Sequence, residues 1–439
     1  MRSGMASIAL AAYRLAGIAA YPFSGLLFAV RAAKGKEDRA RKPERFGYPS
    51  LERPDGPLVW VHAASVGETL AVVPLMRELK RRDIHVLLTS GTVTSAEVIN
   101  RRLGDEVIHQ YVPLDVEPAI GRFLNHWKPD AAISVESEIW PTTILELSRR
   151  HVPQILVNAR ISDRSYKRWM NNHGVAEQLF GKLGLVIAQS DLDAERYRDL
   201  GAWPVSAAGN IKVDTDAPAC DPQLLARYRG QVGKRRTWAA ISTFEGEEQA
   251  AVMVHRALKA KNDQLTIIVP RHPERADELA AMMVSKGLKV ARRSRDDVIG
   301  ADTDIFLGDT IGEMGLYLRL TEIAFVGRSL MTAEGGQNPL EPAMLGCAVL
   351  SGPKVNNFRE SYQKLVRCGG AKIIRDAEML AKAVHFLSTN DLARHKMIDA
   401  SSECVQNMRG ALATTMKGLE PYLNPLTVKA RLEPRSQVR

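Results

Sequence analysis

The chain is poor in cysteine and in aromatic residues, and both shortages limit what it can be. Its 439 residues include four cysteines, none of which forms a C-x-x-C pair or clusters with histidines. Neither a disulfide framework nor a zinc site is expected, and a reducing compartment suits the main body of the chain. Aromatic residues make up 6% of the chain, and zinc-finger spacings and the aromatic signature of RNA-recognition domains are absent. A dedicated nucleic-acid module is therefore disfavoured, and we expect no nucleic-acid partner.

What the chain does have is length, a globular composition and an excess of positive charge. It is 45% hydrophobic and 25% charged, and its length suffices for two domains of ~100–200 residues each. The formal net charge of +10 favours acidic partners such as phosphorylated lipids, nucleotides, nucleic acid or an anionic bilayer surface. The charge alone does not choose among these partners.

Short apolar runs alternate with longer amphipathic stretches, as in proteins built from βαβ units. The runs are continuously hydrophobic, which indicates strands covered on both faces by helices in a parallel sheet. We expect a first set of strands at residues 58–64, 84–90, 107–113, 131–136, 153–158 and 185–190, and a second at 237–242, 265–270, 304–307, 323–326 and 348–350. The predicted fold class is α/β, with two doubly wound, Rossmann-like domains that face each other across a cleft where ligands bind.

The pattern divides the chain into five parts. Residues 1–32 are expected to form an N-terminal membrane anchor, and residues 33–213 a first Rossmann-like domain. Residues 214–222 have the proline and aspartate content of a linker, and residues 223–424 are expected to form a second Rossmann-like domain. Residues 425–439 are polar and basic and are expected to be a loose tail.

The amino-terminal segment departs from the pattern of the rest. Residues 6–30 are apolar or small apart from Arg14, and a basic cluster follows at Arg31, Lys34, Lys36, Arg39, Arg41 and Lys42. We favour an uncleaved anchor that spans the bilayer or lies in its interface, with the basic cluster on the cytoplasmic side. A signal peptide cleaved near residues 19–20 would instead export the body. A buried amphipathic helix with Arg14 at its edge is the other alternative.

A carboxylate and two glycine turns are the first candidates for chemistry. An apolar run ends in Ser65 and delivers Glu68 to a helix start, where it could act as a general base. The same S-x-x-E pattern is a capping box, in which both side chains satisfy helix amides, and this alternative stays open. The stretches at 308–314 and 335–342 each combine a glycine turn, polar residues and a helix start, which suits an anionic or sugar-bearing ligand.

Seven motifs taken together carry a family resemblance: HAASVGE at 62–68, ESEIWP at 136–141, VNARIS at 157–162, GNIK at 209–212, PRHPER at 270–275, GDTIGEM at 308–314 and GGQNPLEP at 335–342. In this order they resemble the Kdo transferases, over about residues 40–420. Those enzymes move 3-deoxy-D-manno-octulosonic acid (Kdo) from CMP-Kdo to a lipid A precursor in Gram-negative bacteria. The resemblance implies an inverting glycosyltransferase of GT-B fold, an anchor on the cytoplasmic face of the inner membrane, and no metal or other cofactor.

The resemblance also implies roles for single residues. Glu68 matches the family's catalytic base. The predicted donor and nucleotide site lies in the second domain and comprises Arg271, Gly312, Glu313, Met314, Asn338 and Glu341. The predicted acceptor or anion site lies in the first domain and comprises Ser65, Gly67, Glu138, Arg160 and Lys212. Each group has a structural alternative: an Arg271–Glu274 ion pair, helix capping by Asn338 and Glu341, and a Glu138–Arg160 pair that closes two strand ends.

Four positions depart from the family's usual pattern. Gln337 and Phe244 stand where histidine is usual, Thr142 replaces asparagine, and Arg328 replaces glycine. The amide of glutamine can still form hydrogen bonds but does not titrate. Phenylalanine can neither form side-chain hydrogen bonds nor titrate. Two other functions therefore stay open: a GT-B enzyme that uses another nucleotide sugar, and a lipid-binding paralogue that has lost catalysis.

Overall fold

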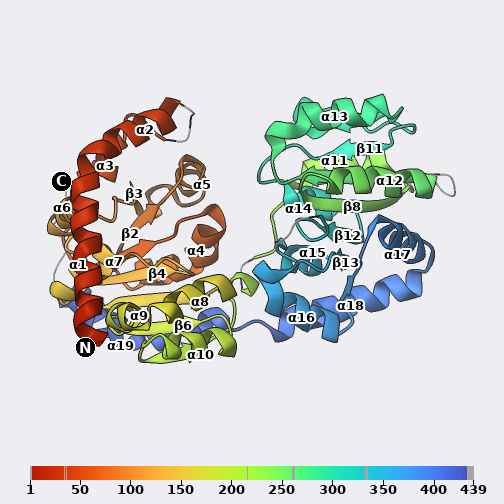
Figure 1. The fold of residues 1–439 in the computed structure, drawn as a ribbon. Helices are drawn as coiled ribbons and strands as arrows, with labels where there is room; N and C mark the ends of the chain where they lie inside the picture. The colour runs from red at the N-terminus through yellow and green to blue at the C-terminus, as the bar shows by residue number, and fades with distance from the viewer. Residues whose placement is uncertain are drawn as a thin grey trace. The chain divides into compact units, whose positions relative to one another are not determined.

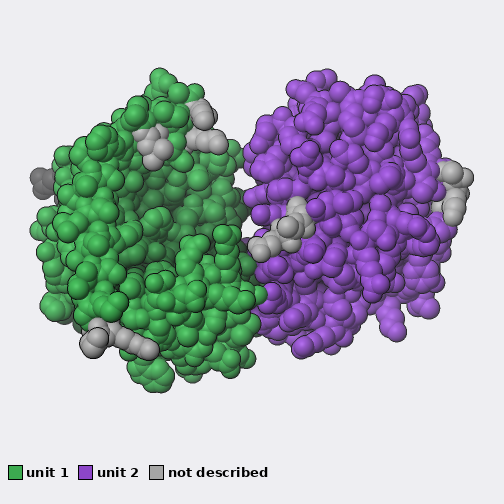
Figure 2. Space-filling view, in the orientation of Figure 1, with its two compact units in different colours: residues 1–215, 409–439 green, residues 216–408 purple. Residues whose placement is uncertain are grey.

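The computed structural model of the chain describes residues 2–33, 35, 37–214, 216–259, 263–331 and 335–432. It divides into two compact units, shown in different colours in Figure 2. Unit 1 comprises Met1–Thr215 and Arg409–Arg439, and unit 2 comprises Asp216–Met408. Each unit is built on a seven-stranded parallel sheet covered by helices (Figure 1). The predicted α/β class with two Rossmann-like sheets is therefore confirmed.

The sheet of unit 1 has the strand order β3-β2-β1-β4-β5-β6-β7. The strands are β1 Leu58–His62, β2 His85–Ser90, β3 Ile108–Tyr111, β4 Ala131–Val135, β5 Gln154–Ala159, β6 Leu185–Ala188 and β7 Val205–Ala207. The order reverses between β1 and β4, and ligands bind at such switch points, outside the carboxyl ends of the strands. The loops after these two strands are consequently the first place to look for a site in unit 1.

Helices cover both faces of this sheet. They are α1 Arg2–Ala20, α2 Ser24–Ala33, α3 Lys42–Arg45, α4 Val66–Arg81, α5 Val93–Leu103, α6 Glu117–Trp127, α7 Pro141–Arg149, α8 Asp163–Asn171, α9 His173–Phe180, α10 Asp191–Asp199 and α19 Ala411–Leu432. The helix α4 shows why they pack: Val72, Leu75, Met76 and Leu79 recur at the helical period and are all buried. They join Val59 and the other inward residues of the strands in one apolar core.

The sheet of unit 2 has the order β10-β11-β9-β8-β12-β13-β14, which reverses between β8 and β12. The strands are β8 Arg236–Thr243, β9 Gln264–Pro270, β10 Val290–Arg292, β11 Ile305–Leu307, β12 Ile323–Val326, β13 Ala348–Ser351 and β14 Ala371–Ile373. The helices are α11 Pro222–Val232, α12 Glu247–Lys259, α13 Ala276–Ser285, α14 Met314–Leu318, α15 Leu340–Met344, α16 Arg359–Arg367, α17 Ala377–Thr389 and α18 Asp391–Asn407.

The last helix corrects two of the predicted domain boundaries. α19 belongs to unit 1, although residues 223–424 were assigned to the second domain and residues 425–439 to a loose tail. Leu419 and Leu423 are fully buried in the core of unit 1, and Asp214 accepts a 2.8 Å hydrogen bond from Gly410 N beside the start of the helix. Residues 433–439 of the predicted tail lie outside the described residues. The chain passes from unit 1 to unit 2 at residues 215–216, inside the predicted linker.

The predicted anchor is helical and only lightly buried. The stretch Gly4–Ala33 is long and apolar enough to cross a membrane, and 6% of its most apolar window is buried. Within it, α1 contacts α9 (Figure 1), with Leu10 buried and Arg14 paired with Glu117 at 2.7 Å. A 3₁₀ turn at Tyr21–Phe23 separates α1 from α2. The segment thus combines features of an anchor with those of the predicted alternative, an amphipathic helix docked at its Arg14 edge.

The basic cluster after the anchor is partly used inside unit 1. Arg31 pairs with Glu37 at 2.8 Å, and Arg41 pairs with Glu44 at 2.8 Å. The next arginine, Arg45, also pairs with Glu37, at 3.0 Å. Lys34 and Lys36 lie outside the described residues. Arg31 and Arg41, whose charges were predicted to set the orientation in the membrane, therefore form ion pairs within unit 1.

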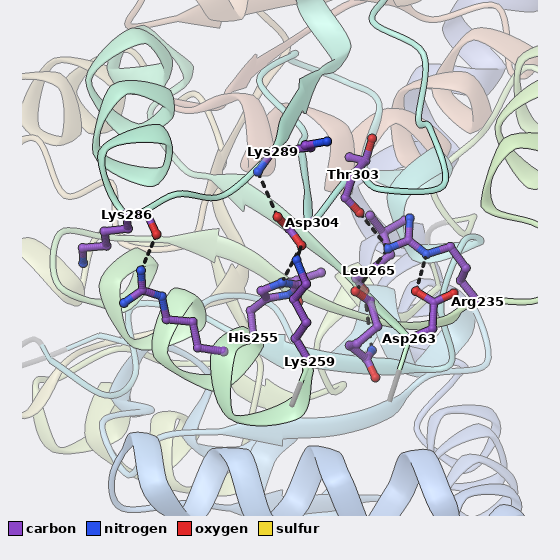
Figure 3. A network of polar contacts seen from close by, with 12 residues as sticks. Arg235, His255, Lys259, Asp263, Leu265, Lys286, Lys289, Thr303 and Asp304 are labelled. Carbon is purple, nitrogen blue, oxygen red and sulfur yellow. Dashed lines mark hydrogen bonds and ion pairs between the residues drawn. The ribbon is translucent and has the colours of Figure 1, made fainter. Parts of the chain in front are cut away.

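A polar network lies at the edge of the sheet of unit 2 where the strands begin, which is the edge opposite to the carboxyl ends of the strands (Figure 3). Asp304, just before β11, contacts His255 at 3.3 Å, accepts a 2.9 Å hydrogen bond from Lys289 N, and pairs with Lys259. The second ring nitrogen of His255 lies 2.9 Å from Thr266 Oγ1 in β9. The network ties α12 to the sheet, far from the strand ends where ligands bind, so its role is structural.

Candidate active site

Glu68 lies in the first turn of the helix that follows β1. Ser65 is the N-cap of α4, and its hydroxyl accepts a 3.3 Å hydrogen bond from Glu68 N. The Glu68 carboxylate in turn accepts hydrogen bonds from Ala64 N and from Ser65 Oγ, each at 2.8 Å. This is a variant of the capping box that was the structural alternative for the S-x-x-E pattern, because the backbone amide that Glu68 accepts from is that of Ala64 and not that of the N-cap Ser65. It holds the carboxylate at the switch point of unit 1.

Electrostatics at this position favour proton uptake by Glu68. Burial, followed by the charge of Glu136, raises the pKa of Glu68, and Glu138 adds to this effect. The hydrogen bonds from Ser65 and Ala64 act in the opposite direction but do not cancel the rise. A carboxylate with a raised pKa at a strand end is suited to general-base work.

Gly67 leaves space next to this carboxylate. It is exposed, and an added Cβ would meet no other heavy atom within 4 Å. Its φ is not in the left-handed region, so the fold itself does not require glycine here. Close approach of a ligand is one physical reason for a glycine at such a place.

Glu138 is held by a histidine that the sequence analysis had not assigned to the site. His62 Nε2 lies 3.4 Å from Glu138 Oε2, and Trp140 Nε1 donates a 2.7 Å hydrogen bond to the same oxygen. Burial raises the pKa of Glu138, but hydrogen bonding and charge from His62 and the Trp140 N–H outweigh it, and the net pKa lies below the ordinary value. On the other side of the ring, His62 Nδ1 lies 2.9 Å from Thr89 Oγ1. Glu138 is therefore an ionised acceptor near Glu68.

Lys212 forms an ion pair with Glu136, which follows β4. Glu136 has a φ of 62°, in the left-handed region that non-glycine residues rarely adopt. Arg160, predicted to bind an anion, has its carbonyl fixed by Ser137 Oγ at 2.6 Å and by Tyr197 Oη at 3.2 Å. Backbone strain such as that at Glu136, held in place by surrounding hydrogen bonds, is common at functional sites.

The carboxyl edge of the sheet of unit 2 is organised around a carboxylate that we had not predicted. Glu247 is 1% exposed, and its two oxygens accept hydrogen bonds from Phe244 N at 3.0 Å and from the amides of residues 328, 329 and 330 at 2.7, 2.9 and 3.0 Å. It joins the loop after β8 to the loop after β12, at the switch point of this sheet. Glu248 is buried as well, and the three glutamates at 245, 247 and 248 gave no signal in the sequence for which of them organises the loops.

Arg271 follows β9 at the same edge of the sheet. It is exposed, and its backbone N–H donates a 3.0 Å hydrogen bond to Thr243 O at the end of β8. Its predicted structural alternative, an ion pair with Glu274, does not form among the described residues, where Glu274 contacts His272 at 3.3 Å instead.

The predicted nucleotide loop at 308–314 follows β11. Gly312 has a φ of 85°, and Met314 begins α14, which is only five residues long. Glu313 is occupied by Arg293, which donates to it at 2.8 Å, and by Thr310. Burial lowers the pKa of Arg293, but Glu313 more than offsets this and the net pKa is raised. The loop shares the carboxyl edge with Arg271.

Asn338 precedes Pro339, the N-cap of the short helix α15, and Glu341 lies in the first turn of that helix. Asn338 Oδ1 accepts a 3.1 Å hydrogen bond from Leu340 N, and Asn338 Nδ2 lies 3.2 Å from Glu341 Oε1. The preceding Gly336 has a φ of 94°, and a Cβ there would lie 2.8 Å from Val355 Cα. The predicted N-x-x-E capping is therefore met only in part: Asn338 accepts from the first amide of the helix, whereas Glu341 contacts the side chain of Asn338.

Within each unit the predicted residues follow strands of one parallel sheet, at its carboxyl edge. Ser65, Gly67, Glu68, Glu138, Arg160 and Lys212 follow strands β1, β4, β5 and β7 of unit 1, and the predicted donor residues follow β9, β11 and β12 of unit 2. In the ranges that the structure describes, no group of three or more His, Cys, Asp or Glu side chains is placed to hold a metal ion. The arrangement in unit 1 supplies a base and cations, and that in unit 2 supplies guanidinium groups and glycine turns.

Comparison with known proteins gives consistent matches. A family model described as 3-Deoxy-D-manno-octulosonic-acid transferase (kdotransferase) matches residues 40–215. A Haemophilus influenzae protein named 3-deoxy-D-manno-octulosonic acid transferase is 35% identical over 415 residues, covering 91% of this chain and 95% of the relative. A Bordetella pertussis protein of the same name is 33% identical over 398 residues, covering 87% of this chain and 91% of the relative.

Solved structures extend the comparison to the fold. The crystal structure of a glycosyltransferase from Rickettsia africae aligns with a TM-score of 0.58 and covers 85% of this chain and 99% of its own. At 13% sequence identity, this likeness concerns the fold alone. The fold of two α/β units that the sequence predicts is therefore shared with a solved glycosyltransferase structure.

Proposed function

The chain belongs to the 3-deoxy-D-manno-octulosonic acid transferase family, and we propose on that basis that it transfers Kdo from CMP-Kdo to a lipid A precursor, a step of lipopolysaccharide biosynthesis. The observation that carries the proposal is 35% identity with a named member of the family along 91% of the chain. The placement of Glu68 at the switch point of unit 1 supports it with a chemical group suited to the reaction.

In the proposed reaction a hydroxyl of the acceptor attacks the anomeric carbon of Kdo. A new carbon–oxygen bond forms as the bond to the CMP phosphate breaks, and the configuration inverts because the two oxygens lie on opposite sides of the carbon. Glu68 takes the hydroxyl proton, and its raised pKa makes it a stronger base than an ordinary glutamate.

The departing phosphate gains negative charge, which cations can stabilise without a metal ion. We assign this role to Arg271, an exposed guanidinium at the carboxyl edge of unit 2. The turn around Gly312, Glu313 and Met314, together with Asn338 and Glu341, would bind the remainder of the nucleotide and sugar. Glu313 acts there through the position it gives to Arg293.

The acceptor is proposed to bind in unit 1. Arg160 would bind an anionic group of the lipid, and Ser65 and Gly67 would contact the acceptor beside the base. Glu138 would accept hydrogen bonds from sugar hydroxyls while His62 holds it ionised. Lys212 would act through its ion pair with Glu136, which is one source of the raised pKa of Glu68.

A lipid acceptor calls for a membrane surface, and we propose the cytoplasmic face of the inner membrane of a Gram-negative bacterium. Exposed apolar side chains on α1, α2 and the turn between them support this placement, and they are Met5, Ile8, Leu15, Ile18, Phe23, Leu26 and Val30. Because Arg14 is held by Glu117 in unit 1, a helix lying in the interface suits α1 better than one that crosses the bilayer.

The test is a transfer assay with purified protein, CMP-Kdo and a lipid A precursor, in the presence and absence of a chelator. Mass spectrometry should show the acceptor gaining one or more Kdo residues, with equal turnover in both conditions. Consumption of a UDP-sugar without any response to CMP-Kdo would identify a different glycosyltransferase. Lipid binding without any product would identify a paralogue that has lost catalysis.

A further inference from the structure

Three adjacent strands of unit 2 end side by side at its switch point. β8 is hydrogen-bonded to β9 on one side and to β12 on the other, with Ile241 opposite both Val269 and Val326. The residues that follow are Arg271 after β9, Phe244 after β8 and Arg328 after β12. Phe244 therefore follows the middle strand, and the strands on either side of it are followed by Arg271 and Arg328.

The backbone at Arg328 is in a conformation that favours glycine. Its φ is 54°, in the left-handed region, and the preceding Gly327 is packed so closely that a Cβ there would lie 2.6 Å from Ser242 O. The Glu247 carboxylate fixes this backbone by accepting from Arg328 N at 2.7 Å. A large side chain in this conformation is strained, and such strain persists where the surroundings impose it and is common at ligand sites.

The side chain of Arg328 lies over the side chain of Phe244. The guanidinium carbon is 5.2 Å from the centre of the Phe244 ring, and the ring itself meets His272 edge-on at 5.4 Å. Both residues are half-buried, which limits their freedom. Stacking uses the face of a guanidinium, whereas a phosphate is bound by the N–H groups at its edge, so the two contacts are compatible.

We propose that Phe244 and Arg328 form a specificity-determining pair of the donor site, in which Phe244 orients Arg328 and Arg328 binds the phosphate of a cytidine nucleotide. The inference rests on the proposed function and deepens it. Phe244 and Arg328 are two of the four positions where the chain departs from the pattern it resembles, and they contact each other. A cation from the neighbouring strand end therefore lies beside position 244, where the pattern has a titratable histidine.

Isothermal titration with CMP can test the pair through four proteins: wild type, Phe244→His, Arg328→Gly and the double variant. We expect Arg328→Gly to weaken CMP binding roughly tenfold or more, as loss of a charge-assisted contact does. Phe244→His should weaken it less, and the double variant should bind no more weakly than Arg328→Gly, because Phe244 acts through Arg328. Additive losses in the cycle would contradict the coupling.

Further measurements separate a binding role from a structural one. Glycine relieves strain at positive φ, so Arg328→Gly should melt at the wild-type temperature or above it while binding CMP less tightly. Arg328→Lys keeps the charge but loses the planar fork, and it should recover only part of the affinity. Arg367→Gln, an exposed charge change on α16, serves as the matched control and should bind CMP normally.

The outcomes for CMP also distinguish this inference from the proposed function. Wild-type protein that binds no CMP would overturn both. If the wild type binds CMP and Arg328→Gly binds it equally well, the proposed role of the Phe244–Arg328 pair is contradicted. The proposal that the protein transfers Kdo is not affected by that result. Cytidine, which lacks the phosphate, should bind the wild type and Arg328→Gly equally, and a loss of cytidine binding in the variant would contradict the phosphate contact.

Discussion

At Glu68 a structural role and a catalytic role use the same carboxylate. Its two oxygens already accept hydrogen bonds from Ala64 N and Ser65 Oγ. Each carboxylate oxygen has two lone pairs, so a substrate hydroxyl can still donate its proton while the cap persists. The capping box and the general base are therefore not exclusive, and the cap is a means of positioning the base.

The pH dependence of turnover tests the environment of Glu68. The base works when deprotonated, so kcat/KM should fall as the pH drops through the raised pKa, which lies above the ~4.3 of an ordinary glutamate. Glu136→Gln removes a charge that contributes to the rise, and should move this acid limb to lower pH. The measurement is a pH profile of transfer for the wild type and Glu136→Gln. An acid limb at the same pH in both proteins would contradict the assignment of Glu68 as the base whose pKa Glu136 raises.

Gly67 offers a second test at single-residue scale. Gly67→Ala adds a methyl group into open space within a helix, so it should stabilise the fold by about 0.5–1 kcal/mol. If the acceptor approaches this backbone closely, transfer should nevertheless fall. Gly121→Ala in α6 is the matched control, because its Cβ also meets nothing within 4 Å, and it should leave transfer unchanged. Thermal melting measures the change in stability, and the transfer assay measures the change in activity. Normal transfer by Gly67→Ala would contradict a close approach of the acceptor to this backbone.

The motif residues were predictable one by one, but their partners were not. Glu68 stands out in the sequence because it follows an apolar run and a small-residue turn. The pairings of His62 with Glu138 and of Lys212 with Glu136 join residues that follow different strands. Such pairs depend on strand order, which local sequence patterns do not specify.

At the scale of elements, the long continuous strands were predictable and the short edge strands were not. β7, β10 and β14 have three residues each and include exposed or half-buried positions, whereas the equally short β11 is buried throughout and was predicted. The helix α19 was missed for another reason, since Pro421 and Pro425 interrupt its pattern. Its apolar residues nevertheless recur at the helical period and complete the core of unit 1.

The role of α19 can be tested by a pair of substitutions in that helix. Leu423 is fully buried in the core of unit 1, whereas Val428 is 55% exposed. Leu423→Ala should lower the free energy of unfolding of the unit by about 2–5 kcal/mol, and Val428→Ala should change it little. Equal, small effects in chemical denaturation would contradict the packing of α19 in the core of unit 1.

At the scale of the whole molecule, length indicated two domains, the alternation of apolar runs indicated the α/β class, and net charge indicated acidic partners. None of them indicated how the amino-terminal segment is held. The sequence showed an apolar stretch containing Arg14, and several positions for it were physically reasonable. The ion pair between Arg14 and Glu117 is what favours a docked helix, and Glu117 is 103 residues away in the chain. No local pattern predicts a contact at that separation.

Membrane association is a prediction for the intact protein. Leu15 and Leu26 are 67% and 72% exposed, so a charge at either site should leave the fold stable. The double variant Leu15→Glu/Leu26→Glu should lose binding to vesicles of phosphatidylcholine and phosphatidylglycerol, because apolar insertion and charge attraction both weaken. Leu392→Glu, at an 82% exposed site in unit 2, is the control and should bind like the wild type. Cosedimentation measures this, and equal binding by all three proteins would count against an interfacial helix.

The most direct test of the account is the turnover of Glu68→Gln. Glutamine also serves in a capping box, so α4 should remain capped and the melting temperature and CMP binding should be unchanged. Without a base, transfer of Kdo should fall by about 10²–10⁴-fold, whereas Glu106→Gln, in an exposed pair with Arg77, should transfer normally. Near-normal transfer by Glu68→Gln would contradict the central claim that this carboxylate takes the proton of the acceptor.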